Sequence, residues 1–304
     1  MPSERPPFDP EVASNFPPSV IDGTISKSQP TDAAARLAAI RAVTDQMGEA
    51  DKKRLYADPL LEVEETTIPG PRGEIEVTLI KPKGYQASAT DKRPAIYFIH
   101  PGGMIVGDAY FNVTVPMPWI KEFGAITAIA DKYGFDPDRL ILAGSSAGGG
   151  LAASVALKAR DQGFPKISAQ LLIYPMLDDR GITVSHRQYF HHGSYTGDSD
   201  EFGYTCLLGD RRGTDKVSVY EAPARATDLS NLPPTYIEVG AAEPFRDAVV
   251  AYASKLWEHG VQAELMVFAG ALHAFDFFAP EASVSKDAVE ARAKWLRRFL
   301  KQLE

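Results

Sequence analysis

The chain has 304 residues, of which 44% are hydrophobic and 24% are charged, a balance typical of a globular enzyme. Its 32 basic and 40 acidic residues give a formal net charge of −8, which disfavours nucleic acid or an anionic membrane as the main partner. No apolar run reaches the roughly 20 residues of a membrane-spanning helix, and the first ten residues lack the pattern of a secretory signal. The single cysteine, Cys206, excludes an intramolecular disulfide, so we expect a cytoplasmic location.

The first sixty residues are expected to form an N-terminal arm and cap helices. Residues 1–31 are rich in Pro, Ser and Asp and have weak periodicity, which is typical of an extended arm. Thr31 or Asp32 can cap a helix over Ala33–Met47, where aliphatic residues recur at helical spacing. A second, short helix is predicted over Ala50–Tyr56.

Residues 61–304 are expected to form an α/β catalytic domain. Alternating apolar and polar residues predict a hairpin of Glu62–Thr67 with Glu74–Lys81, and the apolar run Pro94–Ile99 predicts a buried strand. Strand-like and helix-like segments then alternate, which implies a mostly parallel sheet with helices on both faces. The predicted strands are Leu140–Ala143, Ala169–Tyr174, Thr235–Val239 and Leu265–Phe268, and the predicted helices are Pro116–Phe123, Ala147–Gln162, Phe245–His259 and Ser285–Gln302. Residues 178–215 lack a clear period and are expected to be an insertion beside the sheet.

The strongest local motif is Gly144-Ser145-Ser146-Ala147-Gly148, which has the form G-x-S-x-G. It follows a predicted strand and opens an Ala-rich helix, which is the context of a nucleophile elbow. The helix N-terminus favours developing negative charge, so we predict that Ser146 is a nucleophile. The alternatives are a plain glycine-rich helix start and a phosphate-binding turn, although a P-loop would need a lysine and a different spacing.

A second motif, His100-Pro101-Gly102-Gly103, directly follows the strand Pro94–Ile99. The backbone N–H groups of Gly102 and Gly103, together with that of Ala147, are predicted to form an oxyanion hole. His100 is expected to support this loop. The alternative is a simple turn that ends the strand.

A general base and an acid are expected further along the chain. His273 follows the last predicted strand, and the order Ser, acid, His is typical of this kind of site. Glu243 is the first carboxylate after the preceding strand and is the predicted acid, with Asp247 as the alternative; either could merely cap the next helix. The adjacent His191 and His192 do not predict a metal site, because sequence neighbours rarely share one ion. We therefore expect no metal and no cofactor.

Together these motifs resemble those of the hormone-sensitive-lipase-like family of α/β-hydrolase carboxylesterases. The family's His-Gly-Gly-Gly loop, elbow, acid motif and His-Gly-Phe motif are matched by His100–Gly103, Gly144–Gly149, Glu243–Asp247 and His273–Phe275. The resemblance covers about residues 33–302. It implies an esterase whose cap, built from the N-terminal arm and the 178–215 insertion, lines an acyl pocket.

The sequence departs from the family pattern in several places. Pro101 replaces a glycine and has no N–H, but the resemblance assigns the two donors to the later glycines. Ala274 stands where the family has Gly, and Glu243 stands where Asp is commoner.

The largest departure is the short distance between His100 and Ser146. Only 46 positions separate the two residues, about thirty fewer than in the family, which leaves no room for a further parallel crossover. We therefore predict one helix from about Pro116 to Tyr133 and a sheet one strand short near residues 125–134. The N-terminal hairpin must then shift inward, dock elsewhere or hang loose.

The expected function is hydrolysis of small to medium acyl esters by a Ser-His-Glu triad through an acyl-enzyme. One alternative is an amidase or formamidase that uses the same residues. Another is a non-catalytic small-molecule-binding protein on a hydrolase scaffold. The expected partner is a small-molecule ester; the amphipathic C-terminal helix could also form a homodimer contact, although packing on the sheet gives the same pattern.

Overall fold

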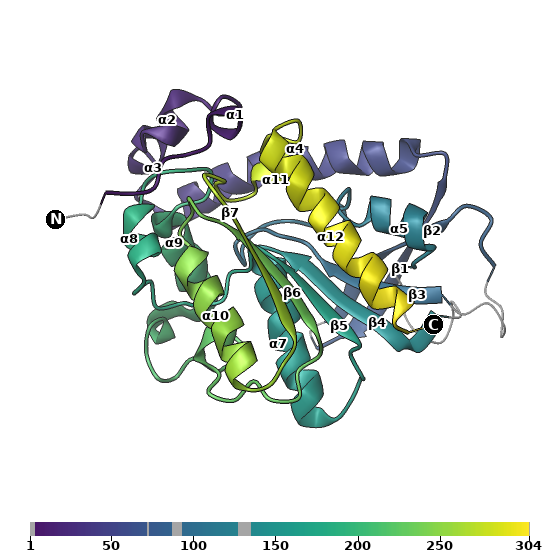
Figure 1. The fold of residues 1–304 in the computed structure, drawn as a ribbon. Helices are drawn as coiled ribbons and strands as arrows, with labels where there is room; N and C mark the ends of the chain where they lie inside the picture. Colours follow the sequence, from purple (N-terminus) through teal and green to yellow (C-terminus); the bar gives the residue numbers. More distant parts are fainter. Residues whose placement is uncertain (1–3, 72, 87–92, 127–134, 304) are drawn as a thin grey trace.

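The computed structural model describes residues 4–71, 73–86, 93–126 and 135–303. Within these residues five parallel strands form one sheet in the order β3-β4-β5-β6-β7 (Figure 1). The strands are β3 (Arg93–Ile99), β4 (Phe135–Ser145), β5 (Ala169–Ile173), β6 (Thr235–Gly240) and β7 (Ala263–Phe268). This arrangement confirms the predicted α/β class.

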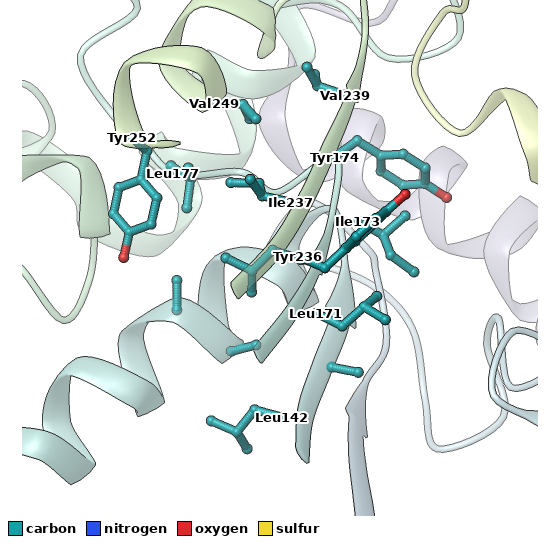
Figure 2. Packing of buried hydrophobic residues seen from close by; sticks show 14 of the residues in the cluster. Leu142, Leu171, Ile173, Tyr174, Leu177, Tyr236, Ile237, Val239, Val249 and Tyr252 are labelled. Atoms are coloured by element: carbon teal, nitrogen blue, oxygen red, sulfur yellow. The ribbon is translucent and has the colours of Figure 1, made fainter. Parts of the chain in front are cut away.

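Helices cover both faces of the sheet, as predicted. Helices α7 (Ala147–Gln162) and α10 (Arg246–Glu258) lie on one face, and α5 (Met117–Phe123) and α12 (Ser283–Lys301) lie on the other (Figure 1). An ion pair of 2.5 Å between Arg297 of α12 and Glu122 of α5 joins the second pair of helices. Parallel strands covered on both faces are mostly apolar, and β5 and β6 are buried throughout, although Gln170, Thr235 and Glu238 are polar or charged. In Figure 2, Ile237 and Val239 of β6 lie on the side of Val249 and Tyr252 of α10, whereas Tyr236 points to the opposite side of the sheet.

The N-terminal region is more helical than predicted. The prediction of an extended arm over residues 1–31 was wrong for the described part, which contains α1 (Pro10–Ala13), α2 (Pro18–Ile21) and α3 (Thr24–Lys27). Prolines begin the first two helices, since their fixed φ suits the first helical turn. Such one-turn helices are too short to leave a periodic signal in the sequence.

A single long helix, α4 (Ala33–Ala57), replaces the two predicted helices. Asp32 caps it, because its side chain accepts the Ala35 N–H at 2.8 Å. Gly48, which lies between the two predicted helices, is part of the continuous helix. A Cβ at this position would lie 3.1 Å from an oxygen of Asp108, so glycine lets α4 pack closely on the segment that contains Asp108.

The predicted hairpin forms a small sheet of its own. Strands β1 (Leu61–Gly70) and β2 (Gly73–Pro82) pair antiparallel and, in the part of the chain that the structure describes, do not join the five-stranded sheet. Their apolar side chains pack with α4 and α5 in a separate cluster formed by Leu55, Leu61, Ile80, Val113, Met117 and Ile120. The hairpin therefore docks beside the main core.

The small core of the hairpin leads to a prediction about proteolysis. Because few apolar groups hold β1 and β2, we expect limited proteolysis to cut residues 61–81 faster than the five-stranded sheet and the helices that cover it. Mass mapping of early fragments would measure this difference. Early cuts within α7 or α10, with residues 61–81 intact, would contradict it.

The prediction of one helix from Pro116 to Tyr133 was wrong. Helix α5 ends at Phe123 because Gly124, with φ +60°, adopts the left-handed conformation that terminates helices. The chain then runs along the outer edge of β3, where Ile126 exchanges backbone hydrogen bonds of 2.9 and 3.0 Å with Ile96 and Pro94. Residues 127–134 lie outside the described residues, so the sheet's lack of one strand near residues 125–134 stays a prediction.

The 178–215 insertion folds into α8 (Val184–Gln188), α9 (Gly197–Leu208) and the short 3-10 helix η1 (Gly209–Arg211). Asp179 anchors it at the start by an ion pair of 2.6 Å to Arg225. Asp198 anchors it to α4 by an ion pair of 2.6 Å to Arg36. The insertion and α4 therefore come together in space. Among the described residues, we find no helix with the length and hydrophobicity required to traverse a membrane.

Candidate active site

Ser146 lies on a sharp turn between β4 and α7. Its backbone has φ +55° and ψ −120°, a conformation that a non-glycine residue rarely adopts. The turn packs tightly because a Cβ on Gly148 would lie 2.0 Å from the Ile99 carbonyl oxygen, and one on Gly144 would lie 2.3 Å from the Gly148 oxygen. The glycines of the motif therefore let β3, β4 and α7 approach one another and present Ser146 at the end of the sheet.

Ser146, His273 and Glu243 form a continuous line of hydrogen bonds. Ser146 Oγ lies 2.9 Å from His273 Nε2, and His273 Nδ1 lies 2.5 Å from Glu243 Oε2. The side chains are buried, since the residues are 4%, 4% and 1% exposed. The second oxygen of Glu243 accepts the Gly240 N–H at 2.9 Å, which fixes the carboxylate. This geometry lets the imidazole accept a proton from the serine while the carboxylate faces its other nitrogen.

The alternative acid, Asp247, lies elsewhere. Its oxygens accept the Ser185 N–H at 2.7 Å and pair with Arg246 at 2.8 Å. Although burial opposes the shift, Arg246 and Ser185 lower the pKa of the Asp247 carboxyl. Asp247 therefore joins α10 to α8, and the carboxylate in contact with His273 is that of Glu243.

The predicted oxyanion loop curls beside the serine. Gly102 and Gly103 have φ of +136° and +57°, and their N–H groups, like that of Ala147, donate to no acceptor among the described residues. The Gly102 carbonyl accepts the N–H groups of two later residues, which closes the loop. His100 Nδ1 lies 2.6 Å from the Pro101 oxygen, and its ring fills the space beside Gly107. His100 thus packs against the loop.

Three aromatic rings surround the imidazole of His273. Its centroid lies 4.8 Å from that of Tyr174, 5.1 Å from that of Tyr195 and 5.1 Å from that of Phe245. In addition, the hydroxyl of Ser194 donates to the His273 carbonyl oxygen. Tyr174, Ser194 and Tyr195 were not predicted from the sequence; the last two lie in the aperiodic insertion and had no local signal.

A cavity of about 430 Å³ opens above Ser146 and His273. One wall is an apolar stripe of α4, and the others come from the oxyanion loop, the insertion and α11 (Phe275–Phe278). The apolar and aromatic lining residues include Ile40, Val43, Met47, Phe111, Tyr174, Tyr195, Phe202, Phe277 and Phe278. Both parts of the expected cap therefore reach the cavity.

The adjacent histidines of the insertion have structural partners. Among the described residues, no group of three or more His, Cys, Asp or Glu side chains is placed to hold an ion. His191 Nδ1 lies 3.2 Å from Ser26 Oγ, and His192 Nδ1 lies 3.2 Å from the Ile21 carbonyl oxygen. Both histidines therefore join the insertion to the N-terminal helices.

Comparison with known proteins identifies the family of the chain. A family model described as the alpha/beta hydrolase fold matches residues 109–277, and the chain belongs to this family. It is 26% identical to Esterase LipI of Mycobacterium tuberculosis over 86% of this chain and 89% of the relative, and 27% identical to Carboxylic ester hydrolase LipN of the same organism over 88% and 77%. A solved bacterial heroin esterase superimposes with a TM-score of 0.81 at 27% identity, covering 96% of this chain and 98% of that one. The resemblance to hormone-sensitive-lipase-like carboxylesterases is thus confirmed, and the chain is a carboxylesterase-type hydrolase.

Proposed function

We propose that this protein is a serine esterase that hydrolyses small to medium acyl esters through an acyl-enzyme. The observation that carries the proposal is the buried line from Ser146 through His273 to Glu243 at the floor of an apolar cavity. Residues 1–60 and the 178–215 insertion are proposed to form the cap of a catalytic domain that spans residues 61–304.

The reaction follows from the positions of these groups. Ser146 Oγ attacks the ester carbonyl carbon while its proton passes to His273 Nε2, and Glu243 stabilises the imidazolium. The N–H groups of Gly102, Gly103 and Ala147 stabilise the negative oxygen of the tetrahedral intermediate. The intermediate then breaks its bond to the alcohol, which takes the proton from His273.

The second half of the reaction restores the serine. Water loses a proton to His273 and attacks the acyl carbon, and the second tetrahedral intermediate expels Ser146 Oγ, which regains that proton. The products are an acid and an alcohol.

A series of p-nitrophenyl esters tests the substrate class. We expect the highest kcat/KM for acyl chains that the cavity of about 430 Å³ encloses, and a fall for long chains. A preference for long acyl chains would contradict the proposed class. Cleavage of anilides or formamides faster than the matching esters would favour the amidase alternative, and no turnover by the folded protein would favour the binding alternative.

The oxyanion loop provides a further expected result. Gly103 has φ +57°, and a Cβ there would lie 3.0 Å from the Tyr195 hydroxyl. Gly103→Ala is therefore expected to displace one predicted donor and to lower kcat about 100-fold, as the loss of one oxyanion donor does elsewhere.

Gly163→Ala is the matched control for this substitution. Gly163 also has a positive φ, +71°, but it ends α7, and a Cβ added there would meet no atom within 4 Å. The substitution should carry a similar backbone cost with unchanged kcat. Equal values of kcat for the two variants would exclude the proposed role of Gly103.

A further inference from the structure

A network of buried polar side chains lies beneath the candidate active site and is not used in the reaction above. It starts at Tyr174, whose hydroxyl donates to Asp276 at 3.0 Å. Arg292 follows, with Nη1 2.6 Å from Asp276 Oδ2 and Nε 3.0 Å from the Glu238 carboxylate. The network ends at Tyr236, whose hydroxyl donates to Glu238 at 2.8 Å. All five residues are less than 10% exposed.

The backbone closes this network into a ring. The N–H of Tyr174 donates to the carbonyl oxygen of Glu238 at 2.9 Å. Tyr174 is thus held twice, by its backbone through Glu238 and by its hydroxyl through Asp276 and Arg292. It also has φ +35°, a backbone conformation that surrounding contacts must maintain in a non-glycine residue.

Only one end of the network reaches the candidate active site. The ring of Tyr174 packs edge-on against the imidazole of His273, with centroids 4.8 Å apart and planes at 67°. Tyr236, at the other end, packs against Trp295 of α12 at 5.7 Å. In Figure 2 the two tyrosines point to the same side of the sheet, and Tyr236 lies nearer the middle of the packed core.

Burying these charges costs free energy that apolar side chains would not cost. Burial raises the pKa of the Glu238 carboxyl, despite the neighbouring guanidinium. Although burial opposes the shift, Asp276 and Glu238 raise the pKa of Arg292. Buried ion pairs add little net stability compared with apolar residues, but fully bonded networks hold side chains in one arrangement. Here the group so held is the ring next to His273.

We propose that Tyr174 is a positioning residue for His273, and that Asp276 and Arg292 act through it. The inference rests on the proposed esterase function. The fixed ring holds the imidazole so that Nε2 faces Ser146 and the leaving group while Nδ1 faces Glu243. Small displacements of such groups have large effects on rate, because the reacting atoms must be aligned.

Two matched substitutions test this proposal. Tyr174→Phe and Tyr236→Phe each remove one phenol hydroxyl from the same network and keep the ring. Tyr174→Phe is expected to lower kcat about tenfold with KM unchanged, because the ring beside His273 is released. Tyr236→Phe is expected to leave kcat and KM at the values of the unmodified protein. Thermal melting of both variants would separate loss of stability from loss of rate.

The outcomes distinguish this inference from the proposed function. If the unmodified protein and Tyr236→Phe hydrolyse p-nitrophenyl esters, the proposed function stands, and only the Tyr174 variant decides the inference. Equal kcat for both variants, or a raised KM with unchanged kcat for Tyr174→Phe, would overturn it. If Tyr174→Phe does not fold, Asp276→Glu alters the same hydrogen bond from its other end and is also expected to lower kcat about tenfold. An unchanged kcat for Asp276→Glu, with or without a raised KM, would overturn the inference.

Discussion

Replacing Ser146 by alanine is expected to lower kcat for ester hydrolysis by about 10⁴-fold or more, as loss of the nucleophile does in other serine hydrolases. The side chain is buried on a strained turn, and its hydroxyl lies 2.9 Å from the His273 imidazole. No other hydroxyl among the described residues shares this contact with His273 Nε2. The steady-state rate of p-nitrophenyl ester hydrolysis by folded protein measures the effect.

The neighbouring Ser145 offers the control for this substitution. Ser145 is equally buried, but its hydroxyl faces the side chain of Asn112, at 3.4 Å. Ser145→Ala is expected to keep kcat within a few-fold. The substitution removes only a long hydrogen bond between two neutral groups, and this bond does not involve Ser146, His273 or Glu243. If Ser146→Ala retained a tenth of the activity, the assignment of the nucleophile would be wrong.

The second large effect is expected for Glu243. Glu243→Gln keeps the size of the side chain but removes the charge that faces His273 Nδ1 at 2.5 Å. The imidazole then lacks the partner that fixes its tautomer and stabilises its cation, so kcat should fall about 10³- to 10⁴-fold. Circular dichroism and thermal melting should show a folded protein.

Asp247→Asn is the matched control for Glu243→Gln. It makes the same chemical change four residues later, where the carboxylate binds Ser185 and Arg246. We expect reduced stability and a nearly unchanged kcat. A larger loss of kcat in Asp247→Asn than in Glu243→Gln would reverse the assignment of the acid.

The core strands and the candidate triad could be predicted because their signals are local. A serine between small residues, at the junction of a predicted strand and a predicted helix, indicates a sharp turn with the serine at its tip. Glu243 and His273 each come a few residues after a predicted strand. Because the strands are parallel and neighbouring, these positions come together at the carboxyl ends of β4, β6 and β7. The sequence left both Glu243 and Asp247 as candidates for the acid. In the structure Glu243 contacts His273, whereas Asp247 binds Ser185.

Other features depend on contacts between distant parts of the chain. The continuity of α4 across Gly48 depends on its packing against Asp108, and the end of α5 depends on the left-handed Gly124. The buried network joins Glu238 to Arg292, which are 54 positions apart. In the sequence, Glu238 is a charged residue near the end of a strand and Arg292 is a charged residue in an amphipathic helix. Such residues are usually exposed, so no pattern in the sequence predicts that they are buried.

Labelling with a fluorophosphonate tests the central claim most directly. An activated serine attacks phosphorus, forms an Oγ–P bond and expels fluoride, so the reaction reports nucleophilicity without knowledge of the natural substrate. We expect one stable adduct on the peptide that contains Ser146, prevented by Ser146→Ala and greatly slowed by Glu243→Gln. A folded, unmodified protein that stays unlabelled, or an adduct on a different residue, would contradict the account.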